Sequence, residues 1–203
     1  MNNFKRNIYK TKSTSIPSNA EFLPFDFMTI RFLYLSPSNG TNLDVMVYYE
    51  NTGTIFDGDA VGSNQTPNDV KVPNNNTPDQ EAYLWWGGDD VNITSGVSVE
   101  GVVINMKRLL TENLVTSRYI DIPLRLSWHD AKGSGTVSMY FSTYTGGTIV
   151  KSGTNFTVQN PISYASISRF NNLISAVGQA TLLNSTLVGT IRYDTLTKQA
   201  VLI

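Results

Sequence analysis

The sequence lacks cysteine altogether and carries little charge. Without cysteine the chain cannot form disulfides or zinc–thiolate sites, and thiol catalysis is excluded. Charged residues make up 15% of the 203 residues, well below the usual quarter, and the formal net charge is −1. A chain so nearly neutral has no overall field that would favour nucleic acid or an anionic membrane. We therefore expect neither nucleic acid nor membrane among its partners.

Long apolar segments are also missing. No apolar run approaches the length of a membrane span, and residues 1–10 lack the apolar core of a signal peptide. On this basis we expect a chain that is made in a cytoplasm and stays soluble there. Asparagine, serine, threonine and glycine fill the place of the missing charges, a composition that is common in extracellular or assembled β-proteins.

Strand-forming sequence is densest between residues 81 and 130, a stretch that includes all three tryptophans. From Ile120 to Trp128 every second side chain is large and apolar, which is the pattern of a strand with one buried face. We expect residues 82–86, 99–105 and 120–130 to form the central strands of a β-sandwich.

Turn-forming pairs of residues predict several hairpins, because asparagine and glycine tolerate the positive φ angles of tight turns. Three strand pairs are expected: 25–35 with 43–49 across Asn39-Gly40, 136–144 with 148–152 across Gly146-Gly147, and 182–193 with 199–203. Short strands separated by glycine turns are typical of sandwiches and jelly rolls.

Little helix is expected. Residues 106–114 fit one short helix with leucines on one face, and residues 168–175 fit one or two helical turns. Residues 51–80 form instead a long polar loop of turn formers, and loops of this length are often functional or interfacial. We expect this loop to be the most variable surface of the protein.

These patterns predict an all-β chain, built as an antiparallel β-sandwich or jelly-roll-like domain. Residues 1–24 are expected to form an extended N-terminal arm, residues 25–158 the sandwich, and residues 159–203 a C-terminal extension with a β-hairpin that contacts a neighbouring subunit. Residues 200–203 are apolar to the last residue. They are expected to complete a sheet, in this subunit or in a neighbouring one.

Three acids are the candidate metal ligands. Asp44, Asp89 and Asp90 follow or precede predicted strands, and their oxygens suit a hard cation such as calcium if the strand ends bring them together. The alternative is that these carboxylates cap turns. No other cofactor is expected.

Catalytic residues are not expected. His129 is the single histidine and Asp130 follows it, but neighbours in a strand point to opposite faces and no Gly-x-Ser-x-Gly nucleophile elbow is present. Several aromatic side chains offer either a sugar-stacking platform or, more commonly in a sandwich, parts of the core. They are Tyr83, Trp85, Trp86, Trp128, Tyr140 and Tyr144.

Short motifs spread over roughly residues 30–152 carry a resemblance. They are Leu43-Asp44 after a Pro/Asn/Gly turn, Leu84-Trp85-Trp86-Gly87-Gly88-Asp89, Val102-Val103-Ile104-Asn105 before Leu109-Leu110, Leu124-Arg125-Leu126-Ser127-Trp128, and Tyr144-Thr145-Gly146-Gly147-Thr148. In these motifs the chain resembles virion structural proteins of tailed bacteriophages, those of crAss-like phages above all. The resemblance implies a capsid-decorating, head-fibre or tail-associated protein of the virion, made in the host cytoplasm and without enzymatic activity.

A more distant similarity is to the tellurite-resistance (TerD-like) calcium-binding β-sandwich. It involves the Leu-Asp strand and the Gly-Asp loop, and it implies calcium ligands at Asp44, Asp89 and Asp90, although Asn42 stands where that family has its first acid. Two functions therefore remain open. One is virion assembly with copies of itself and other virion proteins, with a host surface glycan as a further partner of the 51–80 loop. The other is a calcium- or carbohydrate-binding module.

Overall fold

Alternating apolar and polar sequence forms long strands in the computed structural model, which describes residues 22–36, 42–47, 50–51, 54–55, 61–62, 84–87, 96–111, 117–129, 135–178 and 184–203. The strands are β1 (Phe27–Ser36), β2 (Leu43–Val47), β3 (Glu50–Asn51), β4 (Thr54–Ile55), β5 (Val61–Gly62), β6 (Leu84–Trp86), β7 (Gly96–Asn105), β8 (Tyr119–Trp128), β9 (Gly135–Thr145), β10 (Thr148–Ser152), β11 (Asn155–Gln159), β12 (Ser163–Ile174), β13 (Thr186–Asp194) and β14 (Gln199–Leu202). Helix α1 (Met106–Thr111) follows β7 directly. It is shorter than the helix predicted at 106–114, and no helix of the described residues is long and apolar enough to cross a membrane.

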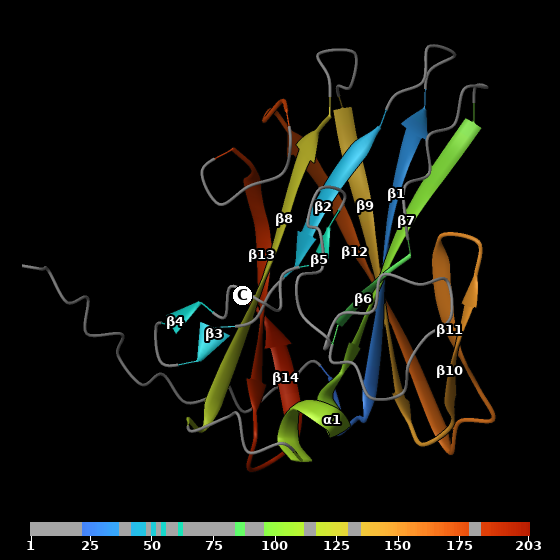
Figure 1. Cartoon of the computed structure of the whole chain (residues 1–203), viewed down its shortest axis with the longest axis vertical. Coiled ribbons are helices and arrows are strands. Elements are labelled where there is room, and N and C mark those ends of the chain that lie inside the picture. Colours follow the sequence, from blue (N-terminus) through green and yellow to red (C-terminus); the bar gives the residue numbers. More distant parts are fainter. Residues whose placement is uncertain are drawn as a thin grey trace, which may run out of the picture.

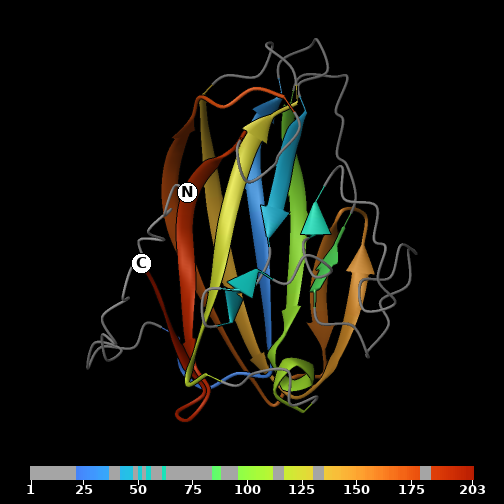
Figure 2. The same ribbon diagram turned by 60° about the vertical axis from the view of Figure 1, so that its left-hand side comes forward.

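The long strands form two sheets that pack face to face (Figures 1 and 2). Sheet I has the order β12–β9–β1–β7–β6, and sheet II has the order β14–β13–β8–β2–β5, with β3 and β4 attached beside β8. Neighbouring strands in both sheets run antiparallel. The predicted all-β antiparallel sandwich is confirmed.

The hydrophobic core lies between the inward faces of the two sheets. In β8 the alternating residues from Ile120 to Trp128 are all buried there, as the sequence predicts. Phe22 closes the core on the side of β12 and β14. Its backbone pairs with Ala200 of β14, and its ring packs on Phe141 of sheet I at a centroid distance of 5.7 Å. The end of the predicted N-terminal arm is thus buried within its own chain, and residues 1–21 lie outside the described part.

The first predicted hairpin is wrong. β1 pairs with β7 and β9 in sheet I, whereas β2 pairs with β8 and β5 in sheet II. The two strands therefore face each other across the core. A turn signal fixes where the chain reverses, but a strand with one apolar face satisfies its backbone equally well in either sheet.

The second predicted hairpin is also wrong in its partner. β10 pairs with β11 and forms a separate two-stranded ribbon, which packs on the outer face of sheet I (Figure 1). Under it lies a second cluster of buried side chains. Its members are Phe27, Trp85, Val103, Tyr144, Ile149, Phe156 and Val158.

The prediction that residues 82–86 form a central strand, which rested on their tryptophans, is also wrong. Strand β6 is three residues long and stands at the end of sheet I, beside β7, rather than in its centre. Trp85 points outward beneath the β10–β11 ribbon, while Leu84 points into the core. Both faces of β6 are therefore buried, which accounts for a composition that looks like a central strand.

The strands that follow residue 158 are members of the two sheets. β12 pairs with β9 in sheet I, and β13 pairs with β8 in sheet II. The helical turns predicted at 168–175 are wrong, because this segment continues β12, with an irregularity in register between Arg169 and Asn172. The predicted pairing of the last two strands is confirmed as β13–β14, so the apolar C-terminal segment completes a sheet in its own subunit.

Candidate functional site

The predicted calcium ligands are not brought together in the described part of the chain. Asp44 lies in β2 with its side chain fully buried, and Oδ1 is 3.5 Å from Nδ1 of His129. Asp89 and Asp90 lie outside the described residues. No group of three or more metal-ligating side chains occurs among the residues that are described.

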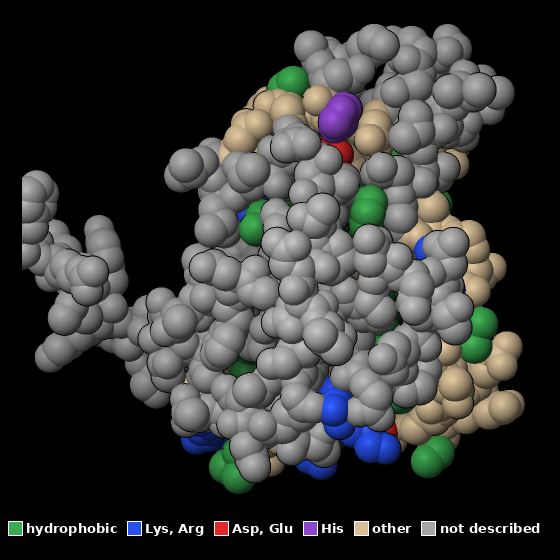
Figure 3. All heavy atoms as spheres, in the orientation of Figure 1, with side chains coloured by type: hydrophobic (Ala, Val, Ile, Leu, Met, Phe, Trp, Pro, Cys, Tyr) green, Lys and Arg blue, Asp and Glu red, His purple; other side chains and the backbone are tan. Residues whose placement is uncertain are grey.

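His129 lies at the end of β8, where its side chain is half-exposed (Figure 3, purple). The sequence pointed to Asp130 as its acid, and that residue lies outside the described part; the structure brings Asp44 of the neighbouring strand to it. Ser127, on the same face of β8, donates its hydroxyl to the carbonyl of Gly178 at 2.8 Å. The hydroxyl is thus bonded to backbone, an arrangement that anchors the 174–178 segment against β8.

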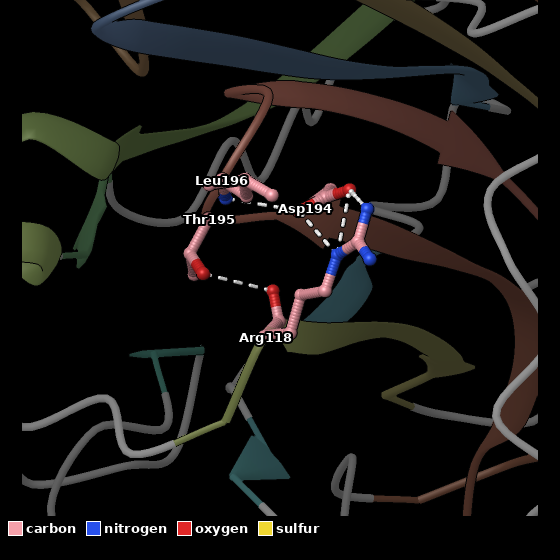
Figure 4. A network of polar contacts seen from close by, with 4 residues as sticks. All are labelled: Arg118, Asp194, Thr195 and Leu196. Atoms are coloured by element: carbon pink, nitrogen blue, oxygen red, sulfur yellow. Dashed lines mark hydrogen bonds and ion pairs between the residues drawn. The ribbon is translucent and has the colours of Figure 1, made fainter.

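A polar network at the other end of sheet II is structural (Figure 4). Arg118 donates from Nε and Nη2 to the buried carboxylate of Asp194, at 3.2 and 2.9 Å. The same carboxylate accepts the backbone N–H of Leu196, and Thr195 donates its backbone N–H and its hydroxyl to the Arg118 carbonyl. These bonds tie the β13–β14 turn to the start of β8. Chiefly through the Arg118 hydrogen bonds, they lower the pKa of Asp194.

The aromatic side chains expected as a platform or as core divide between the two roles. Trp128 is in the main core and Trp85 is buried under the ribbon. Trp86 is half-buried and donates its indole N–H to Glu100 at 3.1 Å. Tyr144 belongs to the same buried cluster as Trp85 and is 8% exposed, whereas Tyr140 is partly exposed on the outer face of sheet I. Tyr83 lies outside the described residues.

The outer face of sheet I beside the ribbon carries three cross-strand rows of polar and aromatic side chains. Strand register places Phe27, Tyr144 and Tyr164 in the first row, Thr29, Ser142 and Ser166 in the second, and Arg31 and Tyr140 in the third. The middle row consists of hydroxyl-bearing residues. An aromatic row flanks it on one side, and a row with a cation flanks it on the other.

The β10–β11 ribbon supplies a wall to this floor, and together they enclose a groove of about 370 Å3. The volume lies at the low end of the range for small-molecule sites. The groove is lined by Thr29, Arg31, Ser142, Tyr144, Ser152, Asn155, Phe156, Thr157 and Tyr164.

Two glycines allow the β10–β11 ribbon to lie close to sheet I. A Cβ atom at Gly87 would lie 1.9 Å from the carbonyl oxygen of Thr154, and one at Gly101 would lie 2.5 Å from it. Only residues without a side chain allow the ribbon turn to approach sheet I so closely. The Thr154 hydroxyl also donates to the Val99 carbonyl, which fixes the turn against β7.

The two tyrosines of the first row line one end of the groove. Their ring centroids are 5.1 Å apart at an interplanar angle of 37°, and the Tyr164 side chain is 58% exposed. Hydrogen bonds from Ser166 and Ser142 lower the pKa of the Tyr164 phenol. These bonds hold the Tyr164 hydroxyl toward the floor, with much of the ring accessible to solvent.

Arg31 is the cation of the groove lining. Its guanidinium carbon lies 5.6 Å from the centre of the Tyr140 ring, a stacking geometry that restrains the side chain on the sheet. In the described part of the chain no carboxylate lines the groove beside it. The arrangement can therefore bind a small polar ligand through hydroxyls, aromatic surface and one positive charge.

Sequence reasoning missed most of this groove. Tyr140 and Tyr144 were recognised as aromatic candidates, but Arg31, Tyr164 and the small hydroxyl residues carry no local motif. The period-two pattern of β9 does place Tyr140, Ser142 and Tyr144 on one face. No known protein family matches the chain, and no curated protein or solved structure shows significant similarity to it.

Proposed function

We propose that this chain is a structural component of a bacteriophage virion, a decorating, head-fibre or tail-associated protein that acts through subunit assembly and performs no catalysis. The motif resemblance in residues 30–152 suggests that the chain belongs to a bacteriophage virion. The observation that carries the proposal is the edge of sheet I formed by β12, which in the described part of the chain is hydrogen-bonded on one side only, to β9.

That edge has the features of a pairing surface. β12 is twelve residues long, and it pairs with β9 in continuous register from Ser163 to Arg169 before the irregularity. An edge strand presents unpaired N–H and C=O groups that another strand can complete. Figure 2 shows β12 and β14 on the same side of the sandwich, where Phe22 also enters the fold.

Apolar side chains gather near the start of this edge. Ile162 is 84% exposed and Leu23 is 64% exposed. Thr145 connects the two segments, since its hydroxyl donates to the Pro24 carbonyl and its own carbonyl accepts the Ile162 N–H. Two such residues beside an open strand edge favour burial by a second subunit. A pairing of β12 with β12 of a second copy would form an isologous dimer.

Light scattering of the purified full chain tests this assembly. We expect a dimer or larger oligomer, and we expect Ala165→Lys, which places a charge near the start of the edge, to shift it toward monomer. Gln159→Lys adds the same charge on the exposed ribbon and should leave the oligomer unchanged. A monomeric parent chain at micromolar concentration would refute self-assembly through β12. Mass spectrometry of purified particles tests the virion assignment.

A second function, carbohydrate binding, is favoured by the groove beside the ribbon. The exposed ring of Tyr164 offers apolar surface to the C–H face of a sugar, and Ser152, Thr157 and Asn155 of the ribbon wall offer hydrogen bonds to its hydroxyl groups. Calorimetric titration with short oligosaccharides tests this function. If the groove binds carbohydrate, Tyr164→Ala should weaken the binding of an oligosaccharide. Binding that this substitution does not affect would refute the function.

A further inference from the structure

The charge of the side chains that line the groove on sheet I indicates which class of ligand the groove can bind. Its lining contains one positively charged side chain, Arg31, and no acid among the described residues. The remaining polar groups are hydroxyls and one amide. A neutral sugar would use these hydroxyls and the tyrosine rings, and it would leave the guanidinium without a matching anion.

Arg31 is placed to receive such an anion. It stands on β1 opposite Tyr140 of β9, two residues along the strand from Thr29 in the hydroxyl row. Stacking on the Tyr140 ring fixes the guanidinium plane and leaves its N–H edges to form hydrogen bonds. A planar guanidinium forms paired hydrogen bonds with a carboxylate, and such charge-assisted bonds are stronger than neutral ones.

The distance between the row of Tyr144 and the row of Arg31 affects which ligands can contact both rows. Tyr144 and Tyr140 are four residues apart on β9, and the hydroxyl row of Ser142 lies between them. Along a strand this separation is about 13 Å. A ligand that lies along the groove from Tyr164 toward Arg31 needs an apolar face at one end and an anionic group at the other.

We propose that the groove binds a short acidic saccharide, in which one ring stacks on Tyr164 and a carboxylate on a neighbouring ring pairs with Arg31. This inference rests on the second function proposed above and adds its ligand class. The exposed Ser152 and Thr157 hydroxyls of the ribbon wall are then the hydrogen-bonding partners of the connecting portion.

The probes are trigalacturonate, its neutral counterpart galactotriose, and a sulfated galactotriose, each titrated by calorimetry into the full chain. We expect trigalacturonate to bind most tightly. Arg31→Gln should weaken its binding about tenfold or more, the loss that removal of one charge-assisted contact produces, and should leave galactotriose binding unchanged. Tyr164→Ala should weaken binding of both.

Control variants separate the outcomes. Lys107→Gln removes an exposed positive charge on α1 and should leave all affinities unchanged, and an unaltered melting temperature of Arg31→Gln shows that the fold is intact. Equal binding of the acidic and neutral probes, unaffected by Arg31→Gln, would refute the acid preference but retain carbohydrate binding. Tighter binding of the sulfated probe would refute a carboxylate ligand. Absence of binding to all three would refute both proposals.

Discussion

Arg118 and Asp194 are 76 residues apart in the sequence, yet the guanidinium donates to both oxygens of the carboxylate, with the shortest contact at 2.9 Å. The side chain of Asp194 is almost fully buried, whereas that of Arg118 is 54% exposed. The pair therefore joins the start of β8 to the β13–β14 turn at the surface of sheet II.

Removal of this pair should reduce stability at neutral pH and have less effect in acid. The hydrogen bonds from Arg118 lower the pKa of Asp194 below its ordinary 3.8. In the pH range between the folded and the ordinary value, the unfolded chain binds the additional proton, so the stabilisation is complete above pH 3.8 and is lost as the pH falls. For Arg118→Gln we expect a lower melting temperature at pH 7 and a smaller difference from the parent at pH 3. Equal differences at both pH values would contradict this assignment, and Lys107→Gln is the control.

Tyr193 should make the fold sensitive to alkali. It is fully buried in the core against Phe25, and among the described residues its hydroxyl has no hydrogen-bond partner. Burial raises the pKa of this phenol well above its ordinary 10.0. Above pH 10 the unfolded chain releases the proton that the folded chain retains, so stability falls as the pH rises.

Tyr193→Phe should remove that sensitivity while it preserves the packing of the ring. We expect the free energy of unfolding at pH 8 to stay equal or to rise by about 1 kcal/mol, because a buried hydroxyl without a partner is itself destabilising. Urea titrations at pH 8 and pH 11 measure both effects. A marked loss of stability at pH 8 would show that the hydroxyl has a bonding role.

A comparison of Trp128 with Trp85 measures how much one indole hydrogen bond contributes to the stability of the fold. Both side chains are buried, but Trp128 Nε1 donates to the Ile174 carbonyl at 3.1 Å, whereas Trp85 Nε1 has no partner in the described part of the chain. Trp128→Phe should therefore destabilise the fold by about 1–3 kcal/mol more than Trp85→Phe. Chemical denaturation of both variants provides the comparison, and equal losses would exclude a stabilising role of this bond between β8 and the end of β12.

The position of the ribbon should depend on two glycines. Gly87→Ala and Gly101→Ala each place a methyl group against the Thr154 backbone. We expect each to cost about 1–3 kcal/mol, as overpacking does, and to increase the solvent exposure of Trp85, seen as a red shift of its fluorescence. Gly189→Ala is the control, because its added methyl meets only the flexible end of the Leu202 side chain. Retention of parental stability by both variants would show that the ribbon is loosely placed.

Parts of the candidate groove could be predicted, and parts could not. Alternation in β9 puts Tyr140, Ser142 and Tyr144 on one face, and their composition suggested carbohydrate contact. Arg31 and Tyr164 join them through strand pairings: Arg31 lies opposite Tyr140, more than a hundred residues away in the sequence, and Tyr164 lies opposite Tyr144. No local pattern encodes such a pairing, because the same alternation satisfies several strand orders.

The predicted metal site also depended on strand pairing, which the local sequence does not encode. Asp44 is recognisable as an acid in a strand, but its burial and its proximity to His129 follow from the pairing of β2 with β8. Leu43 lies opposite Trp128 in that pairing, which brings the end of β8 beside Asp44. An acid that appears available in the sequence is thereby buried beside the half-exposed His129 ring.

The amino-acid sequence by itself determined that this protein is an all-β sandwich, where its main strands other than β12 and its one short described helix lie, and which face of β8 is buried. These are local properties, set by side-chain alternation, β-branched and aromatic composition and turn-forming residues. Tertiary structure alone decided that β1 and β2 enter different sheets, that β10 pairs with β11 over the outer face, and that Arg31 meets the tyrosines of β9 and β12. The physical reason is that strand partners are chosen by the burial of whole apolar faces, and each face can be covered by more than one neighbour.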